Sequence, residues 1–67
     1  MAMQNTMSMG EKLRSARGEK TLEEVATAVK LTVAMISRLE SDDVKPSYDT
    51  MQKLSQYYGI PVGNLFF

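Results

Sequence analysis

The stretch LEEVATAVKLTVAMISRL, residues 22–39, decides the fold of this chain of 67 residues. Its apolar residues recur at spacings of three and four in two runs, and the second run contains Ile36 and Leu39. Only residues 29–31 separate the two runs, and two short helices joined by so tight a turn cross steeply, as in a helix-turn-helix unit. The small side chain of Ala26 permits this crossing, so the stretch predicts such a unit.

Cap residues mark the starts of both helices. Thr21 and Glu24 have the spacing of a capping box, in which each side chain bonds the other residue's backbone N–H. Thr32 is a good N-cap for the second helix. The two helices are therefore expected to begin directly after residues 21 and 32.

Three more helical segments surround this unit. One precedes it and stops at Gly18, and another begins after Ser47 and ends at Gly59 as a left-handed cap. A last short turn follows Pro61 and returns Leu65 to the core. No segment alternates with a period of two, so no strand is expected.

The expected fold is therefore all-α, a compact bundle of five short helices. It forms one domain over residues 9–67, preceded by a flexible tail at residues 1–8. A chain this short has room for one core. Without cysteine it depends on helix packing for its stability.

Composition excludes several classes of function. The chain has no cysteine and no histidine, so we expect no disulfide, no metal site and no cofactor. An enzyme is not expected either, because five short helices offer no obvious cleft and the adjacent Glu23 and Glu24 point in different directions. No apolar run approaches the roughly 18 residues of a membrane span. A cytoplasmic protein is the resulting expectation.

The second helix of the unit has an outer face that is free to bind. This face carries Val33, Ala34, Ser37 and Arg38, with Met35 at its flank. A helix presented in this way fits the major groove of B-form DNA. The charge balance opposes that reading, because eight basic and eight acidic residues cancel, whereas DNA-binding domains are usually basic.

The chain resembles the Cro/repressor-type helix-turn-helix domains, the XRE family, from about residue 10 to residue 66. No single motif is specific, but their order and spacing together are. The motifs are GEKLRSAR (10–17), TLEEVA (21–26), MISRLES (35–41), KPS (45–47) and GIPVGNLF (59–66).

This resemblance implies double-stranded DNA as the partner and a transcriptional regulator, of the repressor kind, as the function. The residues that it implies as base contacts are Thr32, Val33, Ala34, Ser37 and Arg38. Those that it implies as phosphate contacts are Lys30, Lys45, Ser47 and Tyr48. A helix N-terminus at the last of these has free N–H groups that attract anions.

The resemblance also implies an ion pair between Arg17 and Glu40, which would link the first helix to the recognition helix. The alternative is that both are solvated surface charges, and exposed pairs contribute only about 0–1 kcal/mol.

Four features depart from the family pattern. Lys30 stands at a turn position usually held by glycine, and the link between the first two helices is shorter than usual. The base-reading stretch is unusually apolar, and we expect Met35 to fill the core. Asp42 and Asp43 occupy a loop that is often basic and close to the DNA backbone.

The C-terminal aromatic residues indicate a contact surface. Tyr58 and Phe66 are expected in the core, whereas Tyr57 and Phe67 are candidates for a homodimer interface. A dimer would read a palindrome with two recognition helices about 34 Å apart. The rival hypothesis is a protein-interaction or antitoxin-like module on the same fold with weak DNA affinity.

Overall fold

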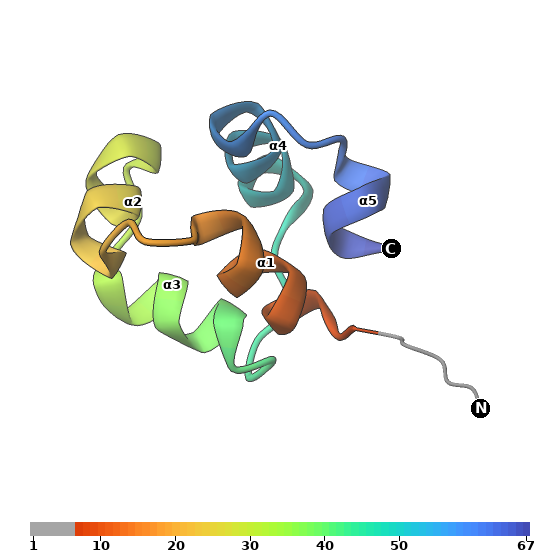
Figure 1. Cartoon of the computed structure of the whole chain (residues 1–67), viewed down its shortest axis with the longest axis horizontal. Coiled ribbons are helices and arrows are strands. Elements are labelled where there is room, and N and C mark those ends of the chain that lie inside the picture. Colours follow the sequence, from red (N-terminus) through yellow and green to blue (C-terminus); the bar gives the residue numbers. More distant parts are fainter. Residues whose placement is uncertain (1–6) are drawn as a thin grey trace.

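The structure is a computed structural model, and it describes residues 7–67. These residues form no strand, and the all-α bundle expected from the sequence is confirmed (Figure 1). Of the predicted tail at residues 1–8, residues 1–6 lie outside the described part. The five helices of the described chain are α1 (Met9–Arg17), α2 (Leu22–Val29), α3 (Val33–Glu40), α4 (Tyr48–Tyr58) and α5 (Val62–Phe66).

Hydroxyl side chains cap the first four helices at their N-termini. The capping box of α2 is confirmed, because Glu24 N–H donates to Thr21 Oγ1 at 3.0 Å and Thr21 N–H donates to Glu24 Oε1 at 2.8 Å. Ser8 forms a second capping box at the start of α1. The expected caps Thr32 and Ser47 accept from backbone N–H groups in the first turns of α3 and α4. Short-range hydrogen bonds therefore fix where these helices begin.

One apolar core joins all five helices. The aliphatic side chains at its centre are no more than 5% exposed, and Leu65 of α5 is 1% exposed, as expected for a helix that folds back on the core. Tyr58 and Phe66 are half-buried at its edge and pack against it. The core comprises Leu13, Val25, Ala26, Val29, Ile36, Leu39, Leu54 and Leu65.

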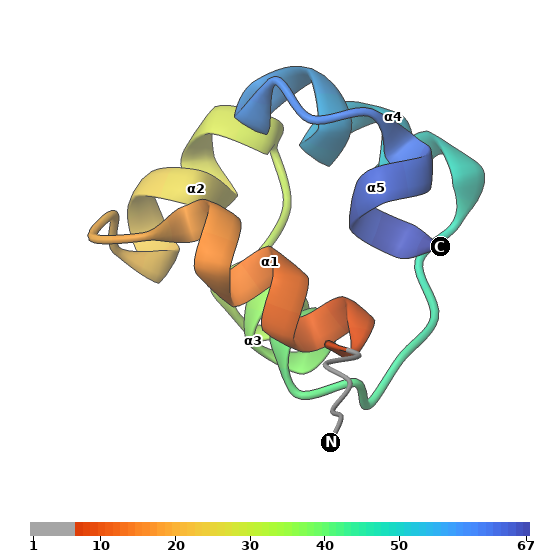
Figure 2. The same ribbon diagram turned by 45° about the vertical axis from the view of Figure 1, so that its right-hand side comes forward.

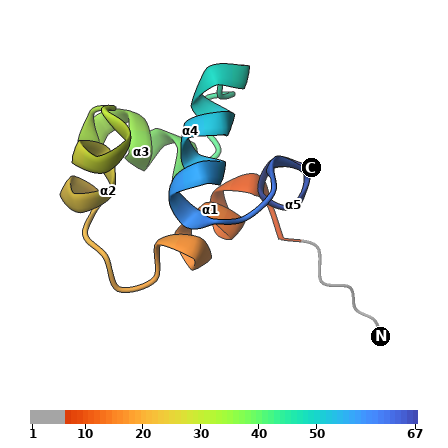
Figure 3. The ribbon, with the colours of Figure 1, turned by 90° about the horizontal axis from the view of Figure 1, so that it is seen from above.

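The helix pair α2–α3 and the short helix α5 lie at opposite ends of the molecule (Figure 3). Helix α1 packs against both α3 and α5, and α4 packs against both α2 and α5. Figure 2 shows α1 crossing in front of α3, with α5 beside α1 on the right. The helix-turn-helix unit is thus supported from behind by α1 and α4, which leaves the other side of α3 uncovered.

Candidate nucleic-acid interface

The turn between α2 and α3 is closed by backbone hydrogen bonds around Lys30. Leu31 N–H donates to Ala26 O at 2.9 Å, and Lys30 N–H donates to Thr27 O at 3.3 Å. Lys30 adopts the left-handed conformation, with φ 61° and ψ 42°. That conformation costs a residue with a Cβ about 1–2 kcal/mol. The chain accepts this cost in a turn that ends α2 and starts α3 within three residues.

Helix α3 has a buried face and an exposed face. Ile36 and Leu39 are 2% and 1% exposed, and Glu40 is 6% exposed. The residues named from the sequence as base contacts all lie on the exposed side of the chain at α3: Thr32, Val33, Ala34, Ser37 and Arg38. Except at Met35, the sequence therefore separated the two faces of this helix correctly.

Met35 was expected to fill the core, and that expectation is wrong. Its side chain is 37% exposed. Met35 directly precedes Ile36, so it points about 100° around the helix from that buried residue. Val33 is 39% exposed. Together the two side chains add an apolar area to the outer face of α3.

Arg17 and Glu40 form a two-pronged ion pair between α1 and the end of α3. Arg17 Nε donates to Glu40 Oε2 at 2.7 Å, and Arg17 Nη2 donates to Glu40 Oε1 at 2.9 Å. The two side chains are only 19% and 5% exposed, so this is not a pair of solvated surface charges. The hydrogen bond to Glu40 raises the pKa of Arg17 above its ordinary value.

The same arginine also holds the short link between α1 and α2. Its remaining nitrogen, Nη1, donates to the backbone oxygen of Lys20 at 2.7 Å. Arg14 lies at the edge of the group, with Nε 3.8 Å from Glu40 Oε1. One guanidinium thereby connects α1, the α1–α2 link and α3.

Asp42 links the end of α3 to the start of α1, a contact that the sequence did not reveal. Gly10 N–H donates to Asp42 Oδ1 at 2.9 Å across 32 residues of sequence. Hydrogen bonds from the Ser8 side chain and from the Gly10 backbone lower the pKa of Asp42. A carboxylate at a helix N-terminus is also favoured by the helix dipole. The carboxylate of Asp42 thus accepts a hydrogen bond from the start of α1 while the residue stays exposed.

Gly10 is required at this contact. A Cβ at that position would overlap Glu40 O and lie 2.8 Å from Asp42 Oδ2. A glycine inside a helical pattern is a signal of close backbone approach, and it could have indicated this crossing. Sequence spacing could not name the partner.

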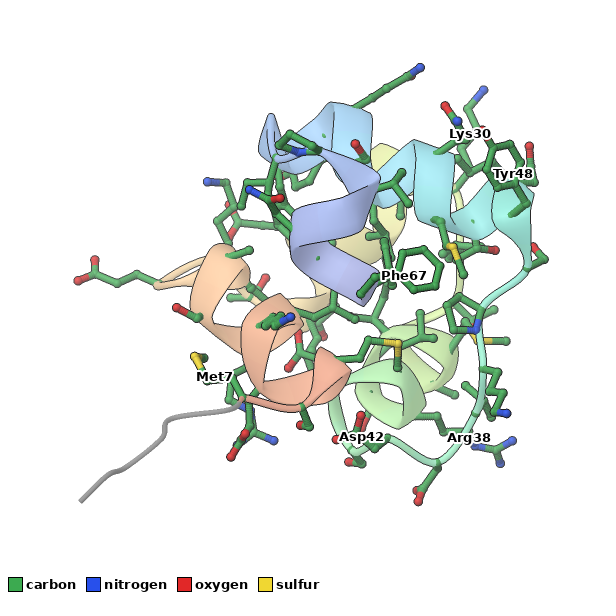
Figure 4. All side chains as sticks on the ribbon, turned by 90° about the vertical axis from the view of Figure 1, so that its right-hand side faces the viewer. Met7, Lys30, Arg38, Asp42, Tyr48 and Phe67 are labelled. Atoms are coloured by element: carbon green, nitrogen blue, oxygen red, sulfur yellow. The ribbon has the colours of Figure 1, made fainter. Side chains whose placement is uncertain are left out.

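The basic and aromatic residues expected to contact phosphate lie along one edge of the molecule. Figure 4 shows Lys30, Arg38 and Tyr48 on that edge, and Met7 on the opposite one. Tyr48 is 69% exposed, and its hydroxyl accepts from Gln52 Nε2 at 2.6 Å. Lys45 is exposed in the loop before α4. The edge therefore joins the outer side of α3 to the N-terminus of α4.

Ser47, expected from the sequence to contact phosphate, is also the N-cap of α4. Its hydroxyl oxygen accepts from Thr50 N–H at 3.2 Å and its hydroxyl hydrogen is directed to Thr50 Oγ1 at 3.1 Å. It caps α4 and thereby orders the free backbone N–H groups of the first turn. Those N–H groups, rather than the occupied hydroxyl, are what an anion would meet there.

Hydrogen bonds within the fold hold half of the acidic side chains. Glu11 and Glu24 belong to capping boxes, Glu40 belongs to the pair with Arg17, and Asp42 contacts α1. These four carboxylates are held at helix starts and at the contact between α1 and α3, whereas Lys30, Arg38 and Lys45 are exposed. Charge segregation onto faces is the arrangement that a neutral DNA-binding domain needs.

In residues 7–67, no group of histidine, cysteine, aspartate or glutamate is placed to hold a metal ion. None of the helices in this range is both long and apolar enough to cross a membrane.

A family model described as Helix-turn-helix matches residues 13–65. This match covers most of the chain and includes α2, α3 and the residues on the exposed edge. The chain belongs to this helix-turn-helix family, and the resemblance to Cro/repressor-type domains is confirmed.

Two known proteins resemble the chain. One is the HTH-type transcriptional regulator DdrOP3 of Deinococcus deserti, which is 38% identical over 61 residues. That match covers 88% of this chain and 47% of the relative, so the chain spans about half the length of that protein. The other is the solution structure of the DNA-binding domain of the P22 C2 repressor, with a TM-score of 0.83 and 23% identity. It matches 92% of this chain and 84% of the other, and it shows the fold.

Proposed function

We propose that this chain binds double-stranded DNA in a sequence-specific manner and acts as a transcriptional regulator. The observation that carries the proposal is the exposed face of α3, with Val33, Ala34, Ser37 and Arg38, on a helix whose opposite face is buried. Buried contacts and the Arg17–Glu40 pair hold this helix in place, so its outer side chains are presented to a groove as a rigid set. The regulator DdrOP3 and the P22 C2 repressor domain support the same conclusion.

Base readout in this proposal depends on one charged and several small side chains. Arg38 can donate two hydrogen bonds to a guanine edge, and Ser37 can bond either kind of base pair. Val33 and Ala34 are suited to thymine methyl groups. Thr32 contributes less than its exposure indicates, because its Oγ1 already accepts from Met35 N–H at 3.0 Å.

Phosphate contacts flank this readout. Lys30 and Lys45 supply positive charge, and the first turn of α4, begun by Ser47 and Tyr48, supplies backbone N–H groups. These contacts fix the position of the domain on the duplex and make its affinity depend on salt.

The whole regulator is proposed to act as a cytoplasmic repressor and to bind a palindromic operator as a homodimer, without catalytic activity. Two copies would double the phosphate contacts of a domain with no net charge.

A second function on the same fold is a protein-interaction or antitoxin-like module. The exposure of Val33 at 39% and Met35 at 37% favours it, because apolar side chains on an outer helix face also suit a protein partner.

DNA selection from a random pool, followed by salt titration on the selected duplex, tests the proposal. We expect enrichment of a defined sequence and an affinity that falls steeply as salt rises. Lys45→Ala should reduce the slope of log K against log salt by about 1. Lys20→Ala, a matched control at an exposed lysine of the α1–α2 link, should leave it unchanged. No enrichment and no binding at low salt would favour the protein-interaction module.

A further inference from the structure

The loop between α3 and α4 has hydrogen bonds at its two ends and none in its middle. At the first end, Asp43 N–H donates to Arg38 O at 2.9 Å. At the second end, Ser47 caps α4. Residues 44–46 form no hydrogen bond with another residue of the described chain. Val44 packs against the core, but apolar contact is non-directional, so the path of the loop depends on how firmly its ends are held.

Asp42 stands at the first end of this loop in a left-handed conformation, with φ 60°. A residue with a Cβ adopts this conformation at a cost in free energy that glycine avoids, although aspartate tolerates it better than most. The side chain makes a contact that glycine could not make, because Oδ1 accepts from Gly10 N–H at 2.9 Å. The unfavourable backbone conformation therefore accompanies a bond to another helix.

The contact between Asp42 and Gly10 adds a second cap to the start of α1. Ser8 Oγ accepts from Glu11 N–H at 3.1 Å, and the carboxylate of Asp42 accepts from the N–H of the residue before. Both N–H groups lie in the first turn, where a helix offers them no carbonyl of its own. The positive end of the helix dipole also favours a carboxylate there. The start of α1 is thus a directional, charge-assisted binding point for Asp42.

This binding point is fixed relative to α3. Gly10 lies so close to the backbone oxygen of Glu40 that a Cβ would not fit between them. About two turns later in α1, Arg17 makes its two-pronged ion pair with the same Glu40. Figure 4 shows Asp42 at the same lower edge of the molecule as Arg38. A loop bound at this point therefore starts from a defined position relative to the outer face of α3.

We propose that Asp42 is a positioning residue for DNA binding, which fastens the start of the α3–α4 loop to α1 and so sets where Lys45 lies relative to the outer face of α3. The inference rests on the proposed function, because Lys45 is one of its phosphate contacts. Lys45 follows Asp42 by three residues, so a shift of the first end of the loop passes on to it. Phosphate contacts fix the register and orientation of a protein on a duplex.

The charge of the same carboxylate acts on a duplex in the opposite direction. Asp42 is exposed, and its negative charge repels the phosphates that Lys45 attracts. The contact with Gly10 therefore strengthens DNA binding while the charge weakens it. A test of the proposal has to separate these two effects.

Two substitutions of Asp42 make this separation. Asp42→Asn and Asp42→Gly both remove the charge, and both residues tolerate the left-handed conformation. Only the asparagine keeps a side-chain oxygen that can accept from Gly10 N–H. A difference between these two variants therefore reports on the contact and not on the charge. Asp43→Asn, at the exposed neighbouring position, measures the effect of one lost charge in the same loop.

Hydrogen exchange in the free protein tests the contact without DNA. Exchange of the Gly10 amide, followed by NMR, should be about two- to tenfold faster in Asp42→Gly than in Asp42→Asn, because only the first variant leaves this N–H without its acceptor. Asp43→Asn should exchange as the parent does at Gly10. Equal exchange rates in the two Asp42 variants would overturn the proposal.

DNA binding tests whether the contact acts through Lys45. On the selected duplex, Asp42→Gly should bind about two- to tenfold more weakly than Asp42→Asn and show a smaller slope of log K against log salt. This difference should disappear when Lys45→Ala is added to both variants. A difference that persists in the Lys45→Ala background would show a merely structural role and overturn the inference.

The same measurements distinguish failure of this inference from failure of the proposed function. A parent chain that binds the selected duplex, with equal affinities for Asp42→Gly and Asp42→Asn, would overturn the inference and leave the proposed function intact. A parent chain that binds no duplex at low salt would overturn both.

Discussion

The two faces of α3 contribute differently to the protein, although α3 is a helix of only eight residues. One face contributes to stability and the other is free to bind. The inner face places Ile36, Leu39 and Glu40 against α1 and the core, where almost nothing is exposed. The outer face places Ala34 and Arg38 in solvent. We therefore expect a change on the inner face to alter the free energy of unfolding and, under the proposed function, a change on the outer face to alter DNA binding. Under the proposed function, this separation would allow a small domain to change its DNA sequence preference without losing its fold.

Truncation of a side chain on the inner face should have the largest effect on the free energy of unfolding. Ile36→Ala removes a side chain that is 2% exposed and should lower the free energy of unfolding by about 2–5 kcal/mol. A small domain has only about 5–15 kcal/mol in total, so much of the fold would be lost. Urea unfolding followed by circular dichroism measures this. Val33→Ala on the outer face of the same helix should change stability by no more than about 0.5 kcal/mol, and equal losses would contradict the comparison.

Loss of the charge on Glu40 should have a smaller effect on stability. Glu40→Gln keeps the shape of the side chain but removes the carboxylate that accepts two hydrogen bonds from Arg17. We expect a loss of about 1–3 kcal/mol, because a shielded arginine then lacks its charged partner. Glu19→Gln, at an exposed position before α2, is the control for urea unfolding. If both variants unfold at the same urea concentration, the link between α1 and α3 does not stabilise the domain.

Removal of the outer-face arginine should affect binding and leave stability unchanged. Arg38→Ala should weaken binding to the selected duplex by about 1–3 kcal/mol and relax the base preference at one position. Its free energy of unfolding should stay within about 0.5 kcal/mol of the parent. Fluorescence anisotropy and urea unfolding on the same sample measure both. An unchanged selected sequence with Arg38→Ala would remove Arg38 from the base-reading set.

The smallest expected effect is a pH dependence of the free energy of unfolding that comes from Tyr58. It is absent at neutral pH. Burial, with a further contribution from the charge of Glu40, raises the pKa of Tyr58 from 10.0 to about 12. Because the folded pKa exceeds the unfolded one, stability is complete below about pH 10 and is lost as the pH rises toward 12. Ultraviolet absorbance of tyrosinate and urea unfolding should follow this loss. Tyr58→Phe cannot ionise there, so it should lose less stability over that range, and an equal loss would contradict the assignment.

The correct predictions from sequence concern interactions within three or four residues. The capping box of Thr21 and Glu24, the cap at Thr32 and the apolar spacing of α3 involve neighbours on one helix, so the chain specifies them locally. The Arg17–Glu40 pair came from the family resemblance, since spacing alone did not indicate it. The roles of the proposed base and phosphate contacts stay predictions.

Contacts between distant segments required the tertiary structure. Helical periodicity did not reveal that Asp42 meets Gly10 across 32 residues, or that Met35 faces solvent. Nor did it reveal that Phe67 lines the same depression as Met9 and Val44, whereas Tyr57 lines a separate one with Lys30.

The amino-acid sequence by itself determined the helices, most of their caps and the buried face of α3, because each depends on hydrogen bonds and side-chain directions repeated every turn. The tertiary structure decided which carboxylates accept hydrogen bonds from distant segments and where the basic edge lies. It also decided that Phe67 lies near the α3–α4 loop. These features depend on how whole helices cross, and the crossing is set by the summed packing of the core rather than by any local pattern.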